Sequence, residues 1–238
     1  MATRASLFLQ SVPAPRAWDD VDETASAIIR ARIYEAMATA IAHGGYASVT
    51  VSDVVRAARI SRRTFYEHFT DKEDCFVATY RSGCENGVAQ IGAALRALDE
   101  PDWRTRLWVS LESYLDILAA EPHFASVLLI DVLGAGPRAL AMRERILNIY
   151  VEHYRGLREL AIEEESGLVR VPDEFLRALV GGIAELVQQC LLDSPTVEVA
   201  ERLRALTPTL VSFASTVLTG GHVTLAQATA RAPARATG

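Results

Sequence analysis

A short polar segment near residue 65 carries the most informative chemistry of this sequence. Adjacent guanidinium groups at Arg62 and Arg63 can donate paired hydrogen bonds to guanine or to a phosphate, and Thr64 can donate to a base or contact a thymine methyl group. Nearby hydroxyl, phenol and imidazole groups can donate to phosphate oxygens. These groups indicate DNA binding, and the residues expected to take part are Thr50, Ser52, Ser61, Arg62, Arg63, Thr64, Tyr66, Glu67, His68 and Lys72.

Glu67 is the acidic member of this set and has two interpretations. A carboxylate that faces DNA must accept a hydrogen bond from a cytosine amino group or keep away from phosphate. Alternatively, Glu67 forms an ion pair with Arg63, one helical turn earlier. The sequence favours neither interpretation.

Two short helices are expected to hold these groups. Thr50 and Ser61 are each placed to cap the start of a helix, and the free N–H groups at the start of the first helix favour a phosphate. The apolar side chains that could fill the corner between the helices are Val54, Val55, Ala58, Ile60 and Phe65. A filled corner fixes the two helices at a steep angle, which is the geometry of a helix-turn-helix whose second helix enters the major groove.

The charge distribution supports this interpretation although the net charge is −6. Residues 24–72 contain seven basic and four acidic side chains, a net charge of +3, so the remainder carries −9. Phosphate neutralisation requires cationic groups. A basic N-terminal part joined to an acidic body is expected when one end of a protein binds DNA and the rest does not.

The sequence as a whole predicts an all-α fold. Apolar residues recur at spacings of three and four almost throughout, and no convincing alternation of period two is present. Besides the two short helices, we expect helices over residues 24–43, 71–98, 101–120, 122–133, 137–165, 172–192 and 195–218. Gly44 and Gly45 should end the first of them, and prolines stand at or near the start of most of the later ones.

The stretch from about Ile28 to Phe76 resembles the DNA-binding domain of the tetracycline-repressor (TetR) family. The matching pieces are Gly45-Tyr46, Thr50-Val51, Asp53, Ala57-Ala58, Ser61, Thr64-Phe65-Tyr66, His68-Phe69 and Lys72-Glu73. Arg59 departs from the family pattern, which has a turn glycine at this position, and Cys75 replaces a usual leucine. A left-handed Arg59 would cost on the order of 1 kcal/mol.

The resemblance implies a transcriptional regulator that forms an obligate homodimer, with a ligand pocket inside the C-terminal helices. The expected domains are a flexible arm (1–23), a three-helix DNA-binding domain (24–70), a larger helical domain for effector binding and dimerisation (71–219) and a disordered tail (220–238). The last two long helices should form a four-helix interface with those of the partner. The candidate interface residues are Leu179, Ile183, Leu186, Leu203, Leu206, Leu210, Phe213 and Val217.

An apolar pocket with a few polar groups is how proteins hold small molecules. The aromatic and imidazole side chains of the larger domain are therefore candidate ligand contacts, although aromatic residues at helical spacing often belong to an ordinary core. The candidates are Trp103, Trp108, Tyr114, His123, Phe124, Tyr150, His153 and Tyr154. The expected partners are an operator in double-stranded DNA, a second copy of the chain, and a small effector that is largely apolar.

Several classes of protein are disfavoured. The sequence contains none of the common hydrolase, zinc-protease, phosphate-loop or dinucleotide-binding motifs, so we expect neither an enzyme nor a cofactor. No apolar run approaches the roughly 18 residues of a membrane helix, and without an export signal the three cysteines are expected in a reducing cytoplasm, unpaired and without metal. A helical ligand-binding or scaffold protein without an operator, and an all-helical enzyme of unfamiliar type, remain as alternatives.

Overall fold

The structure, a computed structural model, describes residues 21–193 and 198–220, and every regular element in these two ranges is helical. This confirms the all-α prediction. The N-terminal elements are α1 (Val21–Ser48), α2 (Val51–Ala58) and α3 (Arg62–His68). The larger part comprises α4 (Lys72–Arg96), α5 (Trp103–Ala120), α6 (Pro122–Leu129), the 3-10 helix η3 (Asp131–Gly134), α7 (Pro137–Glu164), α8 (Asp173–Asp193), α9 (Val199–Ala205) and α10 (Thr207–Leu218).

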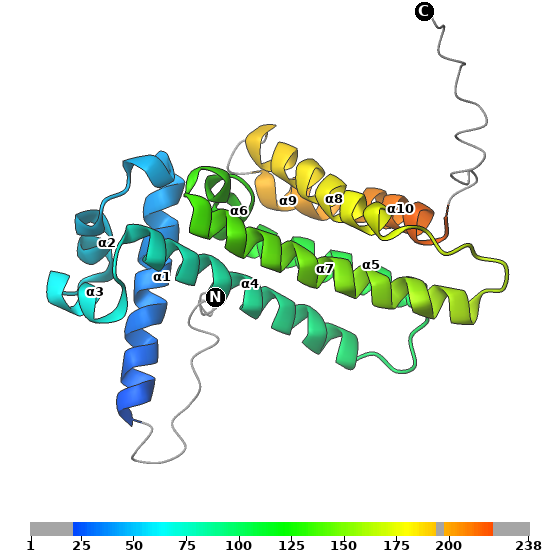
Figure 1. Cartoon of the computed structure of the whole chain (residues 1–238), viewed down its shortest axis with the longest axis horizontal. Helices are drawn as coiled ribbons and strands as arrows, with labels where there is room; N and C mark the ends of the chain where they lie inside the picture. The colour runs from blue at the N-terminus through cyan, green and yellow to red at the C-terminus, as the bar shows by residue number, and fades with distance from the viewer. Residues whose placement is uncertain (1–20, 194–197, 221–238) are drawn as a thin grey trace, which may run out of the picture.

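Helices α1, α2 and α3 form one end of the molecule (Figure 1). Val54, Ala58 and Phe65 are buried in the corner between α2 and α3, as the apolar pattern predicts. Helix α1 begins at Val21, inside the segment 1–23 that we expected to be a flexible arm, so this boundary is wrong by three residues. The helix is interrupted at Gly45 (φ 75°, ψ 156°), where a left-handed backbone favours glycine and where the sequence predicts the end of the helix.

The larger part is a bundle around α5. This helix contacts α4, α7, α9 and α10. Its side chains Leu107, Leu111, Leu115 and Leu118 are buried in the core of the bundle. Helix α4 leaves the N-terminal end of the molecule and runs along α7 and α5 (Figure 1). The bundle therefore shares α4 with the end that carries α2 and α3. The predicted arm and tail otherwise lie outside the described residues, as do residues 194–197.

Two long helices expected from the sequence are divided. The expected helix 122–133 is α6 followed by η3, and the expected helix 195–218 is α9 and α10 with Leu206 between them. Pro208 lacks the N–H that would bond to the carbonyl of Arg204 in a continuous helix. The hydroxyl of Thr207 donates to that carbonyl instead (2.9 Å), which satisfies it at the break.

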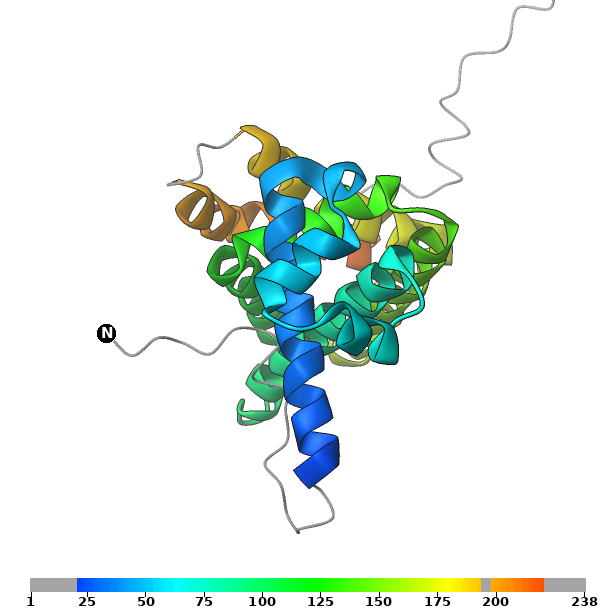
Figure 2. The same cartoon turned by 90° about the vertical axis from the view of Figure 1, so that its left-hand side faces the viewer.

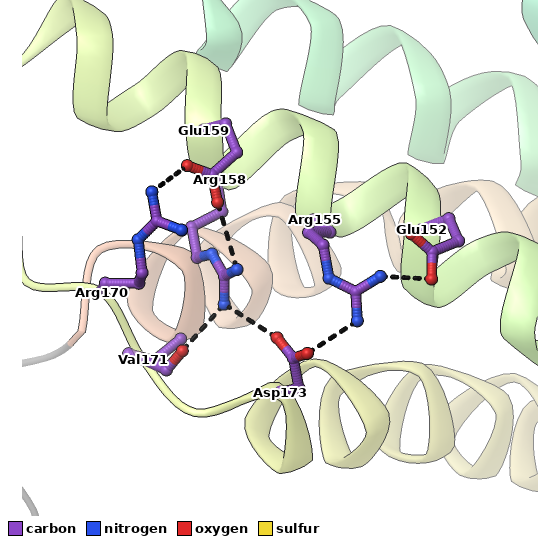
Figure 3. Close-up of polar contacts among 7 residues, drawn as sticks. All are labelled: Glu152, Arg155, Arg158, Glu159, Arg170, Val171 and Asp173. Atoms are coloured by element: carbon purple, nitrogen blue, oxygen red, sulfur yellow. Dashed lines mark hydrogen bonds and ion pairs between the residues drawn. The ribbon is translucent and has the colours of Figure 1, made fainter.

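The connection between α7 and α8 is fixed by a buried arginine (Figure 3). Arg158 is only 3% exposed, and its Nη1 donates to the carbonyl of Val171 (2.8 Å) and to the carboxylate of Asp173 (3.4 Å). Arg155 donates to the same carboxylate (2.8 Å), which holds the pKa of Asp173 below its ordinary value. Asp173 begins α8, so the cluster anchors the start of α8 on the end of α7.

Candidate DNA interface and ligand cavity

The start of α2 is fixed by a capping box. The backbone N–H of Asp53 donates to the Thr50 hydroxyl (3.3 Å), and the backbone N–H of Thr50 donates to the Asp53 carboxylate (3.0 Å). The hydroxyl of Thr50 also donates to this carboxylate (2.6 Å), and these hydrogen bonds lower the pKa of Asp53. Thr50 and Ser52 are both exposed at this helix start, where the positive end of the helix dipole favours an anion.

The turn between α2 and α3 has the left-handed geometry that the family pattern implies. Arg59 has φ 53° and ψ 49°, although it carries a Cβ. Arg32 of α1 donates to the carbonyl of Ala58 (2.5 Å) and, at 3.4 Å, to that of Arg59. A side chain from α1 therefore holds the end of α2 and the turn that follows it.

Helix α3 presents its polar side to solvent. The N–H of Thr64 donates to the Ser61 hydroxyl (2.9 Å), which caps the helix, and Phe65 is fully buried beneath it. Ser61, Arg62, Arg63, Tyr66 and Glu67 are exposed, whereas Thr64 and His68 are half-buried. Figure 1 and Figure 2 show α3 on the outside of the molecule, away from α8, α9 and α10.

The structure pairs Glu67 with Arg63, which is the second of its two interpretations. Their side chains lie 3.0 Å apart and are 54% and 89% exposed. An exposed pair one helical turn apart is worth roughly 0.3–0.5 kcal/mol. A phosphate or a base that approaches Arg63 can replace so weak a partner.

Lys72 is already engaged within the chain. Its ammonium donates to the carbonyls of Tyr46 and Val49, both at 3.0 Å, and lies 4.1 Å from the centre of the Tyr46 ring. A lysine has three N–H groups, so one is left for a phosphate. Its main role in this structure is to join the segment between α1 and α2 to α4.

His68 is placed as a neutral donor. Burial and the nearby positive charge of Arg30 lower its pKa, with burial the larger cause. A neutral imidazole carries its N–H on one nitrogen only. In the absence of DNA, His68 therefore offers a phosphate a single uncharged N–H donor.

A cavity of about 170 Å³ lies in the larger part, between α4, α5, α6, α7 and α8. Most of its wall is apolar, with Ile91, Leu95, Leu111, Leu129, Ile146 and Val180 among the lining residues. Four of the candidate ligand residues line it: Tyr114, Tyr150, His153 and Tyr154. Their positions in the sequence do not predict that all four line the same cavity.

The other four candidates lie outside this cavity. Trp103 is fully buried at the start of α5, where its indole N–H donates to Glu165 (2.5 Å) at the end of α7. Phe124 packs against α4, where Gly83 leaves room for its ring. Trp108 is 40% exposed, and His123 is exposed at the start of α6.

The sequence analysis missed the other lining residues, among them Tyr80 and Arg143. Tyr80 lies on the buried side of α4 and has the aromatic type that singled out the other candidates. Arg143 gives no such signal, because an arginine on a long helix normally belongs to the solvent-facing side.

His153 is oriented by a serine of α5. The Ser110 hydroxyl donates to the carbonyl of Arg106 (2.7 Å), which leaves the hydroxyl oxygen to accept from His153 Nε2 (3.1 Å). This arrangement assigns the proton of the ring to Nε2. Burial lowers the pKa of His153, so the imidazole is neutral in the cavity wall at pH 7.

The candidate interface residues divide into two groups. Leu179, Ile183, Leu203 and Leu210 are buried in the core of their own chain, which leaves them little surface for a partner, and their place in an interface stays a prediction. Leu186 is 37% exposed, and Leu206, Phe213 and Val217 are half-buried. The spacing of apolar residues marks a buried side of a helix, but it does not tell whether the chain itself or a partner buries it.

Two sets of polar contacts fix the region where the larger part meets the DNA-binding end. Asp131 of η3 accepts a hydrogen bond from the backbone N–H of Tyr46 (3.1 Å) and another from the Ser126 hydroxyl (3.0 Å). Arg138 of α7 donates to Glu73 (2.9 Å) and to Asp71 (2.7 Å) at the start of α4. Both sets are close to the helices that line the cavity, because α6 precedes η3 and Arg138 lies on α7.

The described residues contain no group of three or more histidine, cysteine or acidic side chains that could hold a metal ion. Among the helices described, α8 has the length and mean hydropathy of a membrane span. The apolar residues of α8 are largely explained by its packing, since Leu176, Leu179 and Val187 lie in the protein core.

Comparison with known proteins supports both parts of the structure. Residues 33–79 match the model of the family described as "Bacterial regulatory proteins, tetR family". The fold of the chain is similar to that of the transcriptional regulator FadR from Bacillus subtilis, solved in complex with stearoyl-CoA (TM-score 0.65, 17% identity, covering 80% of this chain and 98% of FadR).

Two further solved structures share this fold. One is the fatty acid degradation regulator FadR from Bacillus halodurans (TM-score 0.65, 19% identity, covering 81% of this chain and 95% of that one). The other is SCO4454, a TetR-family transcriptional regulator from Streptomyces coelicolor (TM-score 0.60, 19% identity, covering 86% and 96%). No curated protein sequence matches the chain significantly.

Proposed function

We propose, from the match of residues 33–79 to the tetR family of bacterial regulatory proteins, that this chain is a dimeric cytoplasmic repressor released from its operator by a small molecule. DNA binding and transcription regulation are the properties of the family. The operator, the dimer and the effector are our proposals for this chain. Regulators of this family are generally not enzymes.

The observation that carries the proposal is the exposure of α3. Arg62 and Arg63 stand on its outer side, and no ion pair joins Arg62 to any residue in the described ranges. In the major groove these two guanidiniums and Thr64 would contact bases. Tyr66 and His68 would donate to phosphates, as would the start of α2 at Thr50, Ser52 and its free N–H groups.

The dimer is proposed to form through the outer side of α8 and α10. We define the α8/α10 face as Ala178, Gly182, Leu186, Thr209, Ser212, Phe213 and Thr216, which are exposed or half-buried. These residues are small or apolar, and Phe213 packs directly over Gly182. A two-fold dimer must place its two α3 helices about 34–36 Å apart to enter successive major grooves.

The effector is proposed to act from the cavity. Leu128 and Leu129 of α6 line it, and η3, which follows α6, holds Tyr46 at the end of α1 through Asp131. The stearoyl-CoA bound to the Bacillus subtilis FadR supports ligand binding by a domain of this fold. By thermodynamic linkage, an effector that weakens operator binding must itself be weakened by the operator to the same extent.

The test is the double variant Arg62→Ala/Arg63→Ala, with DNA from upstream of the chain's own gene as the probe. The wild type should bind this DNA with an affinity that falls steeply with salt. Each lost base contact is worth about 1–3 kcal/mol, so the variant should bind at least about 30-fold more weakly. The double variant Arg96→Ala/Arg145→Ala removes the same charge from exposed positions outside α3 and should bind normally.

Equal affinities of the wild type and the α3 variant would refute our assignment of base recognition. If the wild type itself showed no salt-dependent DNA binding, the alternative of a helical ligand-binding protein without an operator would replace the proposal. Circular dichroism of each variant checks that the helices are intact.

A further inference from the structure

The polar groups of the cavity belong to one cluster. We define the phenol cluster as Tyr80 of α4, Tyr114 of α5, and Tyr150 and Tyr154 of α7, all of which line the cavity. The rings of Tyr114 and Tyr150 meet edge to face, with centres 6.0 Å apart. After the larger effect of burial, the thiol of Cys84 and the phenols of Tyr114, Tyr80 and Tyr154 each raise the pKa of Tyr150 further.

Three of these hydroxyls are not satisfied by the protein. The Tyr80 hydroxyl bonds to the thiol of Cys84. The hydroxyls of Tyr114, Tyr150 and Tyr154 have no hydrogen-bond partner in the described part of the chain, although Tyr154 is only 5% exposed. None of the three oxygens is among the fully buried polar atoms that lack a partner in the described ranges, so each is open to the cavity, where water or a ligand can accept its hydrogen bond. Three such donors around one hollow favour a ligand that brings hydrogen-bond acceptors.

The charge of the cavity has one sign. Burial raises the pKa of every member of the phenol cluster, so these side chains are neutral donors at pH 7. Arg143 is the single lining residue with a formal charge, because His153 is neutral. It lies near the phenol of Tyr80, whose pKa it lowers slightly against the larger effect of burial.

Arg143 has no acid to neutralise it within the described ranges. The acid beside it in sequence, Glu144, is paired with Arg177 of α8. By contrast, Arg138, Arg155 and Arg158 of the same helix all have carboxylate partners. A half-buried guanidinium next to an apolar hollow therefore supplies a free site for a bidentate anion.

The volume of the cavity limits the size of the occupant. An apolar protein cavity of about 150 Å³ is known to hold one benzene molecule, and this one is about 170 Å³. Beyond the phenol cluster, Arg143, His153 and Ser110, its wall is made of aliphatic side chains and Gly92. The inner space thus matches an apolar body of about one aromatic ring, whereas a long acyl chain with its coenzyme would have to extend through the open side of the cavity.

We propose that the cavity binds a small carboxylic acid with a one-ring apolar body, its carboxylate on Arg143 and the phenol cluster and its ring among the aliphatic side chains. This inference rests on the proposed function of the cavity as the effector site. A charged group can enter such a site only when it is paired and hydrogen-bonded. Arg143 supplies the opposite charge, and the phenols supply the remaining hydrogen bonds.

The experiment is calorimetric titration of the full chain with benzoate, phenylacetate and salicylate, and with benzyl alcohol as a neutral probe of similar size. At least one of the acids should bind at least about tenfold more tightly than benzyl alcohol, because hydrogen bonds to charged groups contribute about 1.5–3 kcal/mol. Arg143→Gln should remove this preference and leave the affinity for benzyl alcohol unchanged. Arg143→Lys should retain part of it.

Arg145→Gln is the matched control. Arg145 lies two residues further on α7, is exposed and does not line the cavity, so this variant should bind the acid as the wild type does. Three results would overturn the proposal. The first is equal binding of all three acids and benzyl alcohol, and the second is an acid preference that survives Arg143→Gln. The third is binding of stearoyl-CoA and of none of the acids.

The failure of this proposal and that of the proposed function are distinguishable. If no acid binds, but the wild type still binds the operator more tightly than the α3 variant does, the proposed ligand class is wrong and the proposed DNA-binding function is retained. If an acid binds through Arg143 but leaves operator affinity unchanged, the ligand class stands and the release mechanism is wrong.

Discussion

Arg59 shows how a single residue can carry strain in the element that contacts DNA. It occupies the left-handed region with a φ of 53°, which favours glycine. Its cost is offset by the carbonyl contacts from Arg32, which depend only on the backbone of the turn. The strain is therefore local, and it can be relieved without changing the contacts of α2 and α3.

We expect Arg59→Gly to raise the free energy of unfolding by about 1 kcal/mol, because the left-handed conformation costs a residue with a Cβ about this amount. Urea denaturation at a fixed protein concentration measures the change. The control is Ala57→Gly, two residues earlier in a helical part of α2, which should lower the same quantity by about 1 kcal/mol. A lower stability for Arg59→Gly would show that the arginine side chain stabilises the turn.

The sequence predicts the residues of the DNA interface better than those of the cavity. The groups from Ser61 to Glu67 are local, so the start and period of one helix are enough to place them on the outer side. The cavity draws on five helices that are far apart in sequence. Residue type correctly suggested Tyr114, Tyr150, His153 and Tyr154 as lining residues. It also suggested Trp103, which instead donates a hydrogen bond to Glu165, a contact that no local pattern reveals.

At the scale of the element, the same limit applies to α8 and α10. Their apolar seam was predicted, but Leu179 and Leu210 belong to the core of their own chain. The break at Leu206 was also missed. Pro208 lies in the first turn of α10, and a proline in a first turn does not tell whether a loop or another helix precedes it. What is left for a partner is the set of small and half-buried residues of the α8/α10 face.

We expect Ser212→Arg on the α8/α10 face to raise the dissociation constant of the dimer by at least about 100-fold, because an unpaired charge buried in an interface costs roughly 3–5 kcal/mol. Ser212 is exposed in the single chain, so the variant should fold normally. Light scattering over a range of concentrations measures the mass. Glu163→Arg, at an exposed position near the end of α7, should remain dimeric.

A dimer of Ser212→Arg with unchanged affinity would place the interface on another surface of the chain. The same measurement would then be repeated with Leu186→Arg, which alters the α8 side of the face. If both variants stay dimeric, the α8/α10 face is not the interface.

At the scale of the whole molecule, the DNA-binding end and the bundle are joined by few polar contacts. The predicted boundary between residues 70 and 71 stays a prediction, because α4 packs on both sides of it. Asp131 is the contact that links η3 to the backbone at Tyr46. Helix α1 also packs against α4, α6 and η3, so the loss of this hydrogen bond should free the backbone at Tyr46 without separating or unfolding the two parts.

We expect Asp131→Ala to increase the rate of amide hydrogen exchange at Tyr46 by at least about tenfold, because this N–H loses its acceptor and a hydrogen bond to a charged group is worth about 1.5–3 kcal/mol. Peptide-level mass spectrometry over residues 44–50 measures it. The matched control is Asp116→Ala, which removes the ion pair with Arg204 between α5 and α9 and should leave these amides unchanged. Unchanged exchange in Asp131→Ala would mean that another contact protects Tyr46.

The buried Arg158 has a mechanical consequence for α7. With a rise of about 1.5 Å per residue, Arg143 lies about 22 Å and Arg138 about 30 Å along the helix from Arg158. If α7 moves as a rigid rod that pivots where Arg158 anchors it, a sideways displacement at Arg143 is enlarged by about one third at Arg138. A molecule seated against Arg143 would thus push about three quarters of the way along this rod, whose far end holds Asp71 and Glu73 on either side of Lys72, directly after the helix proposed to meet DNA.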